Sequence, residues 1–179
     1  MKLAILGRTS YLIETAKRLL GRGNSIELVW TSRPQPFYGV NEGDFRDLAL
    51  EAGAAFRMGG GLSRPEAIKY LQSLQLDAAV SINWPTRISM QVINSFRYGV
   101  LNAHLGDLPR YRGNACPNWA ILNGEAHAGL CIHQMGEEID NGPIILRDFC
   151  FCKRIPTLVK FTLGLRRGLQ TCFQMHWRD

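Results

Sequence analysis

Two polar residues close a segment that otherwise reads as a buried strand. Asn102 and His104 end the apolar run that begins at Gly99, and a loop rich in glycine and arginine follows them. Because residues two apart in a strand point to the same side, the carboxamide and the imidazole should share one face. A buried amide without a partner costs about 1–3 kcal/mol, so the pair needs either a structural partner or a function.

A third polar group comes from a later loop. Asp140 lies in an acidic loop, residues 136–142, between two predicted strands. An amide, an imidazole and a carboxylate at neighbouring strand ends suit acyl transfer to an amine. The amide would stabilise a tetrahedral oxyanion, the imidazole would move a proton, and the carboxylate would set the imidazole's charge. The residues leave open whether His104 is the base or a charged oxyanion donor. An Asn–His pair satisfied by neighbouring backbone is the structural alternative.

The pattern of apolar runs predicts the elements that would position these residues. Strands are expected at 2–7, 25–31, 54–57, 77–82, 99–104, 128–135 and 143–149. Helices are expected at 10–20, 44–52, 63–74, 89–95 and 116–122. A capping box of Ser63 and Glu66 should open the third helix. Strands that alternate with helices predict an α/β, Rossmann-like three-layer domain with a mostly parallel twisted sheet, whose ligands bind beyond the carboxyl ends of the strands.

Length and composition indicate ordinary globular material. The chain has 179 residues, 46% hydrophobic and 20% charged, and no apolar run approaches the roughly 20 residues of a membrane span. No signal peptide is evident, so a cytoplasmic location without membrane binding is expected. The net charge of +6 arises mostly near the end of the chain, so we do not expect a nucleic-acid partner. Five cysteines without a CxxC pair predict neither a disulfide framework nor a metal site.

Several segments together resemble the formyltransferases that use 10-formyltetrahydrofolate, such as methionyl-tRNA formyltransferase, glycinamide ribonucleotide transformylase and the sugar-nucleotide N-formyltransferases. These segments are Asn102-Ala-His104, LGDLPRYRG at 105–113, AILNGE at 120–125, GLCIHQM at 129–135 and the acidic loop through Asp140. The resemblance implies the formyltransferase fold, catalytic roles for Asn102, His104 and Asp140, and 10-formyltetrahydrofolate as cosubstrate without a metal.

The resemblance also implies ligand contacts. The folate is expected to lie against Ile82, Asn83, Trp84, Leu105, Leu108, Arg112, Gly113 and Ile139. The acceptor is expected to contact Arg8, Tyr111 and Asn114. Core packing is the alternative for Trp84, and a solvated loop position is the alternative for Arg8. His133 falls within a predicted strand and is expected to have a structural role.

The expected acceptor is a small primary amine, most simply an amino sugar carried on a nucleotide. The tRNA enzyme of the family has an additional carboxy-terminal domain, for which this chain has no room. The glycinamide ribonucleotide enzyme usually opens with a glycine-serine-asparagine phosphate loop, which LGRTS at 6–10 lacks. Two alternatives stay open: hydrolysis of 10-formyltetrahydrofolate, and an inactive folate-fold protein that serves as a binding module. A homodimer is also left open.

The catalytic domain is expected to span residues 1–149, followed by a divergent basic tail at 150–179. The family pattern ends near Phe149, and basic residues concentrate after Lys153. A frameshift that replaced the native ending is one hypothesis. A basic amphipathic tail for RNA or a membrane surface is another, and a divergent helix packed on the domain is the third.

Overall fold

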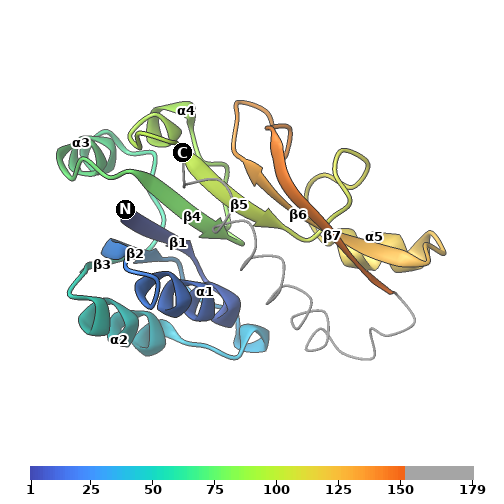
Figure 1. Cartoon of the computed structure of the whole chain (residues 1–179), viewed down its shortest axis with the longest axis horizontal. Helices are drawn as coiled ribbons and strands as arrows, with labels where there is room; N and C mark the ends of the chain where they lie inside the picture. The colour runs from blue at the N-terminus through green and yellow to red at the C-terminus, as the bar shows by residue number, and fades with distance from the viewer. Residues whose placement is uncertain (152–179) are drawn as a thin grey trace. The chain divides into compact units, whose positions relative to one another are not determined.

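A computed structural model describes residues 1–151 of the chain (Figure 1). Its strands are β1 Lys2–Gly7, β2 Ser25–Thr31, β3 Ala55–Met58, β4 Ala78–Ile82, β5 Val100–His104, β6 His127–Gln134 and β7 Ile144–Phe151. Its helices are α1 Ser10–Leu20, α2 Glu42–Ala52, α3 Pro65–Ser73, α4 Met90–Ile93 and α5 Cys116–Leu122, with a 3-10 turn η1 at Pro36–Tyr38. The strand order is β3-β2-β1-β4-β5-β6-β7, which confirms the predicted α/β class.

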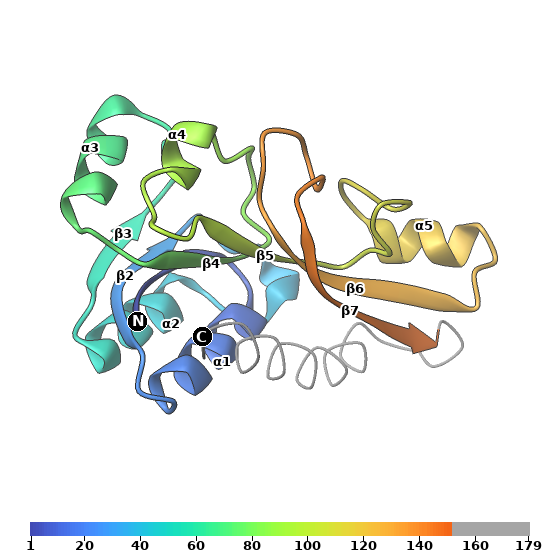
Figure 2. The same cartoon turned by 45° about the horizontal axis from the view of Figure 1, so that its top comes forward.

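The chain forms two compact units, Met1–Leu101 and a second unit that begins at Asn102. In the first unit, β1 pairs in parallel with β2 and with β4, and β2 pairs in parallel with β3. Helices α1 and α2 cover one face of these strands, and α3 and α4 lie on the other face (Figures 1 and 2). Strands covered on both faces read as continuous apolar runs, as Leu3 to Leu6 do.

Local capping sets where two helices of the first unit begin. Asn41 caps α2 through a capping box with Asp44, so this helix starts two residues before the predicted position. The predicted box of Ser63 and Glu66 is wrong: α3 begins at Pro65, and Arg64 is its N-cap without a side-chain hydrogen bond. Proline at the first helical position is already set for the helix and needs no amide partner, so a side-chain cap is not required there.

The end of β1 closely approaches the end of β4. Gly7 has a φ of 152°, and a Cβ at this position would lie 2.1 Å from the carbonyl oxygen of Ile82. Only glycine fits such a contact without displacing backbone. The close approach brings the segments after the two strands, which begin at Arg8 and Asn83, to the same edge of the first unit.

The second unit contains an antiparallel pair, β6 and β7, with α5 packed against β6 (Figure 2). The loop after His104 lies close to β6, since a Cβ at Gly129 would be 2.5 Å from the Cα atom of Asp107. Arg147 of β7 also donates a hydrogen bond to the carbonyl of Leu108 in this loop. Strand β7 runs two residues past its predicted end and includes Cys150 and Phe151. The remainder of the predicted tail lies outside the described residues.

Candidate active site

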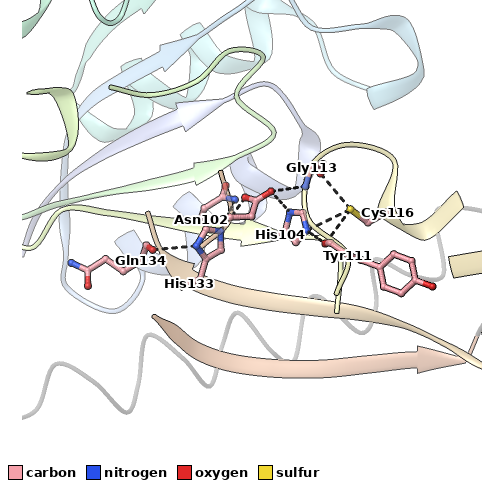
Figure 3. Close-up of polar contacts among 8 residues, drawn as sticks. Asn102, His104, Tyr111, Gly113, Cys116, His133 and Gln134 are labelled. Atoms are coloured by element: carbon pink, nitrogen blue, oxygen red, sulfur yellow. Dashed lines mark hydrogen bonds and ion pairs between the residues drawn. The ribbon is translucent and has the colours of Figure 1, made fainter. Parts of the chain in front are cut away.

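Asn102 and His104 lie on β5, and Asp140 lies in the loop between β6 and β7. The two β5 side chains are buried, with exposed fractions of 8% and 7%, and both point into one polar cluster (Figure 3). Asp140 has a φ of 50°, a left-handed conformation that aspartate tolerates better than most residues. The structure thus brings the three predicted catalytic residues into one cluster of the second unit.

The imidazole of His104 has a different partner on each side. Its Nδ1 lies 3.4 Å from Oδ2 of Asp140, and its Nε2 lies 2.7 Å from the carbonyl oxygen of Tyr111. Because a carbonyl oxygen can only accept a hydrogen bond, Nε2 must carry the hydrogen. This contact leaves Nδ1 as the nitrogen that can exchange a proton beside Asp140.

His133 connects the amide to the carboxylate. Its Nε2 lies 3.2 Å from Nδ2 of Asn102 and 3.4 Å from Oδ1 of Asp140, and its Nδ1 lies 3.2 Å from the carbonyl of Gln134. With an exposed fraction of 1%, the ring cannot reach a ligand in solvent. The sequence prediction gave His133 only a structural role and missed its contacts with two predicted catalytic residues. A histidine within an apolar strand, seven positions before Asp140, was the available signal.

Two opposed influences set the charge of His104. Burial is the larger one and lowers the pKa of the imidazole below its ordinary value of 6.5. The carboxylate of Asp140 and the carbonyl of Tyr111 raise this pKa without fully compensating. The unliganded site therefore holds a neutral His104 at pH 7.

Asp140 stays ionised in spite of its burial. Burial raises the pKa of this carboxyl, but the contact with His133, the electrostatic interaction with His104 as the carboxyl titrates and the N–H of Gly113 together hold it below the ordinary value. The N–H of Gly113 donates to Oδ2 at 2.9 Å. A carboxylate that accepts such hydrogen bonds keeps its negative charge next to the imidazole.

Cys116, the first residue of α5, lies next to the imidazole of His104. Its Sγ is 3.5 Å from Nε2 of His104 and 3.3 Å from the carbonyl oxygens of both Tyr111 and Gly113 (Figure 3). Burial raises the pKa of the Cys116 thiol, so the sulfur keeps its hydrogen and can donate it to these carbonyls. Cys116 is thus a packing and hydrogen-bonding neighbour of the site and is not set up as a nucleophile.

The other predicted ligand residues of the second unit lie around this cluster. Leu105 is half-buried and Leu108 is fully buried in the core, while Ile139 is 61% exposed. Arg112 is exposed and donates to Oδ1 of Asn141, and Asn114 is exposed. Tyr111 directs its hydroxyl to Glu125.

Within the first unit, the predicted ligand residues lie at the ends of β1 and β4. The guanidinium of Arg8 is 5.4 Å from the ring centre of Tyr38, and Asn83 donates to the hydroxyl of the same tyrosine. Ile82 is buried at the end of β4. Trp84 is half-buried, and its indole N–H donates to the Thr86 hydroxyl at 3.1 Å. The indole therefore keeps an exposed part, which full core packing would not leave.

Two negative findings concern the described range. Among residues 1–151, no group of three or more His, Cys, Asp or Glu side chains is arranged to hold a metal ion. None of the helices in that range combines the length and the apolar character needed to cross a membrane.

Comparison with known proteins gives a consistent picture. A family model described as formyl transferase matches residues 1–161. The methionyl-tRNA formyltransferase of Caulobacter vibrioides is 32% identical over 154 residues, which cover 82% of this chain and 48% of that protein. The chain therefore spans about half the length of this curated relative.

Solved structures share the fold at low identity. A formyltetrahydrofolate deformylase from Pseudomonas syringae superposes with a TM-score of 0.75 at 19% identity, covering 98% of this chain and 60% of that one. An N-formyltransferase from Helicobacter canadensis, in complex with folinic acid and dTDP-3-aminofucose, superposes with a TM-score of 0.71 at 18% identity, covering 97% and 62%. The predicted resemblance and its fold are confirmed by these matches.

Proposed function

Because the chain belongs to the formyl transferase family, we propose that it transfers a formyl group from 10-formyltetrahydrofolate to a primary amine. The observation that carries this proposal is the contact of His104 with Asp140, joined through His133 to Asn102. These residues supply an amide, an imidazole and a carboxylate, which suit acyl transfer to an amine, and they lie in one cluster.

The chemistry follows from where charge develops. The neutral amine attacks the formyl carbon, and the carbonyl oxygen becomes negative in the tetrahedral intermediate. An N–H of Asn102 stabilises this oxyanion. When the intermediate collapses, the bond between the formyl carbon and N10 of the folate breaks. The proton lost by the amine is returned to N10, so the products are a formamide and tetrahydrofolate.

We assign the proton transfer to Nδ1 of His104. This residue is neutral at pH 7, and its Nε2 hydrogen is committed to the carbonyl of Tyr111, so the lone pair of Nδ1 can accept the proton of the amine. Asp140 then stabilises the imidazolium at a distance of 3.4 Å. This proposal selects the base role from the two roles that the sequence left open.

Ligand contacts remain proposals from the family resemblance. For the folate, we propose Ile82, Asn83, Trp84, Leu105, Leu108, Arg112, Gly113 and Ile139. For the acceptor, we propose Arg8, Tyr111 and Asn114.

Among acceptors, we propose an amino sugar carried on a nucleotide. The Helicobacter canadensis structure supports this choice, because an enzyme with the same fold was crystallised with such a molecule. Two other acceptors have support of their own. The curated methionyl-tRNA formyltransferases favour a tRNA-linked methionine, and the Pseudomonas deformylase favours water.

An assay of tetrahydrofolate release tests the reaction and the acceptor together. The full chain is incubated with 10-formyltetrahydrofolate and with a dTDP-linked amino sugar, with methionyl-tRNA, or without an amine. Release that depends on the amino sugar supports the proposal. Release only with methionyl-tRNA, or equal release without any amine, replaces the acceptor by tRNA or by water.

Binding and turnover should separate in variants of the cluster. His104→Ala and Asp140→Ala are expected to abolish formyl transfer, because each removes a group that acts on the transferred proton. Calorimetric binding of folinic acid should remain measurable in both variants. Equal loss of binding and turnover would count against the role assignment. A wild-type chain that binds folinic acid but transfers nothing would be a binding module.

A further inference from the structure

Two residues of one short segment, residues 111–113, hold His104 and Asp140 through their backbone. The carbonyl of Tyr111 accepts from Nε2 of His104 at 2.7 Å, and the N–H of Gly113 donates to Asp140 at 2.9 Å. Backbone groups at these positions can be supplied by any residue type except proline at 113. The precision of the two contacts therefore depends on how the segment 111–113 is anchored.

The anchor of this segment is the side chain of Tyr111. Its hydroxyl donates to Oε1 of Glu125 at 2.9 Å and accepts from Nδ2 of Asn123 at 3.1 Å. Both partners lie in the turn between α5 and β6. The turn itself is fixed to the helix, because the N–H of Glu125 donates to the carbonyl of Ala120 at 2.9 Å. The tyrosine hydroxyl thus donates one hydrogen bond and accepts another, both with residues of this turn.

The fit between the Tyr111 carbonyl and the imidazole leaves little free space. A Cβ at Gly106 would lie 2.4 Å from the Tyr111 oxygen and 2.5 Å from Nε2 of His104. The thiol of Cys116 contacts the same carbonyl from α5. In such a packed arrangement, a displaced Tyr111 carbonyl would release or rotate the imidazole of His104.

We propose that Glu125 is a positioning residue for His104: by holding the hydroxyl of Tyr111, its carboxylate fixes the carbonyl that keeps the hydrogen of His104 on Nε2 and turns Nδ1 toward Asp140. This inference rests on the proposed function for its kinetic consequence only. The tautomer of His104 is a property of the unliganded chain.

The charge of Glu125 is consistent with this role. The hydrogen bond from Tyr111 is the main cause that lowers the pKa of the Glu125 carboxyl, so the group is ionised and accepts only. Arg110 also donates to Glu125, but the Arg110 side chain is 62% exposed. Solvent screens an exposed ion pair of this kind, so the contact with Tyr111 is the one expected to matter.

The test compares four variants of the full chain. Glu125→Ala and Tyr111→Phe each remove the hydrogen bond between the two side chains. Glu125→Gln keeps an acceptor for the hydroxyl and serves as the conservative rescue. Arg110→Met removes the exposed ion pair and retains the contact of Tyr111 with Glu125, so it is the matched control.

The first readout is the ¹⁵N spectrum of the His104 imidazole without ligand. The wild type, Glu125→Gln and Arg110→Met should show a single tautomer with the hydrogen on Nε2. Glu125→Ala and Tyr111→Phe should show a mixture of tautomers and faster exchange of that hydrogen. An unchanged spectrum in both of the latter variants overturns the inference, even if the chain transfers no formyl group.

The second readout is steady-state kinetics with the acceptor that supports turnover. Loss of this hydrogen bond should lower kcat about tenfold, equivalent to about 1.4 kcal/mol, with KM for the formyl donor nearly unchanged. Glu125→Gln should recover most of kcat. A rise in KM alone, or an equal loss in Arg110→Met, would show that Glu125 does not act through Tyr111.

Discussion

At the scale of single residues, His104 uses one ring nitrogen to bind the protein and keeps the other for chemistry. His104 commits Nε2 to the Tyr111 carbonyl and presents Nδ1 beside Asp140. The carboxylate of Asp140 accepts from Gly113 through Oδ2 and lies near His133 through Oδ1. Such fixed partners reduce the reorganisation required when charge appears in the reaction.

The titration of His104 checks this arrangement directly. Burial lowers the pKa of the imidazole below 6.5, whereas Asp140 raises it. The ¹H resonance of C2 of His104 should therefore titrate below pH 6.5 in the wild type and at a still lower pH in Asp140→Asn. Because a protonated imidazole cannot accept the proton of the amine, kcat/KM should fall as pH falls through the same value. A midpoint above 6.5 would contradict the assignment.

Gly106 offers a steric test of the same contact. The Cβ of Gly106→Ala would lie 2.4 Å from the Tyr111 oxygen, so the carbonyl or the imidazole must move. We expect a loss of about tenfold or more in kcat, since small misplacements of catalytic groups are costly. Gly60→Ala is the control, because a Cβ at Gly60 would meet nothing within 4 Å. Equal activity of the two variants would rule out the steric argument.

The grouping of the three predicted catalytic residues could be predicted from the sequence for a physical reason. The alternation of a strand places Asn102 and His104 on one face, and loops after neighbouring strands meet at one edge of a sheet. The position of His133 in an apolar strand could mark it as a candidate, but its contacts with Asn102 and Asp140 could not be predicted from the sequence. These contacts depend on the register of β6 and on the left-handed backbone of Asp140, and neither is encoded in local spacing.

At the scale of elements, apolar runs predicted the positions of strands better than capping residues predicted the first residues of helices. The bounds predicted for β2 and α5 agree with the structure, because turn residues or a proline delimit each run. The predicted start of α3 was wrong because two helix-start signals, Ser63 and Pro65, lie within three residues. Proline at the first helical position prevailed over a serine that could have capped the helix.

This difference leads to a stability prediction with a matched control. Asn41→Ala removes the hydrogen bond from the N–H of Gly43 to the Asn41 side chain, and should lower the free energy of unfolding by about 1 kcal/mol. Asn41→Asp, which retains the acceptor, should lose less. Ser63→Ala should leave stability within about 0.5 kcal/mol of wild type, because Ser63 does not cap α3. Urea unfolding measures all three, and a larger loss in Ser63→Ala would restore the predicted capping box.

At the scale of the whole molecule, the boundary between the two compact units falls within β5, between Leu101 and Asn102. No linker, proline or change of composition marks this position, so a division of the chain there could not be predicted. The three predicted catalytic residues and His133 all belong to the second unit. The predicted extent of the catalytic domain, residues 1–149, stays a prediction.

The buried cluster should also link global stability to pH. Since folding lowers the pKa of His104, the unfolded chain binds more protons between the folded pKa and 6.5. Stability should rise with pH across that window and be independent of His104 above it. One proton limits the slope to about 1.4 kcal/mol per pH unit. Asp140 acts in a separate pH window. Because folding lowers the pKa of its carboxyl, its contribution to stability is present above the ordinary value of 3.8 and is lost only as the pH falls below that value.

Urea unfolding of the full chain between pH 5 and 7.5 measures this linkage. His104→Gln should flatten the pH dependence in that range, because glutamine keeps an N–H for the Tyr111 carbonyl but does not titrate. His127→Gln removes an exposed histidine outside the cluster and is the matched control. If His104→Gln keeps the full slope, another group is the source of the pH dependence. Folding would then not lower the pKa of His104, and the assignment of a neutral His104 as the base would lose this support.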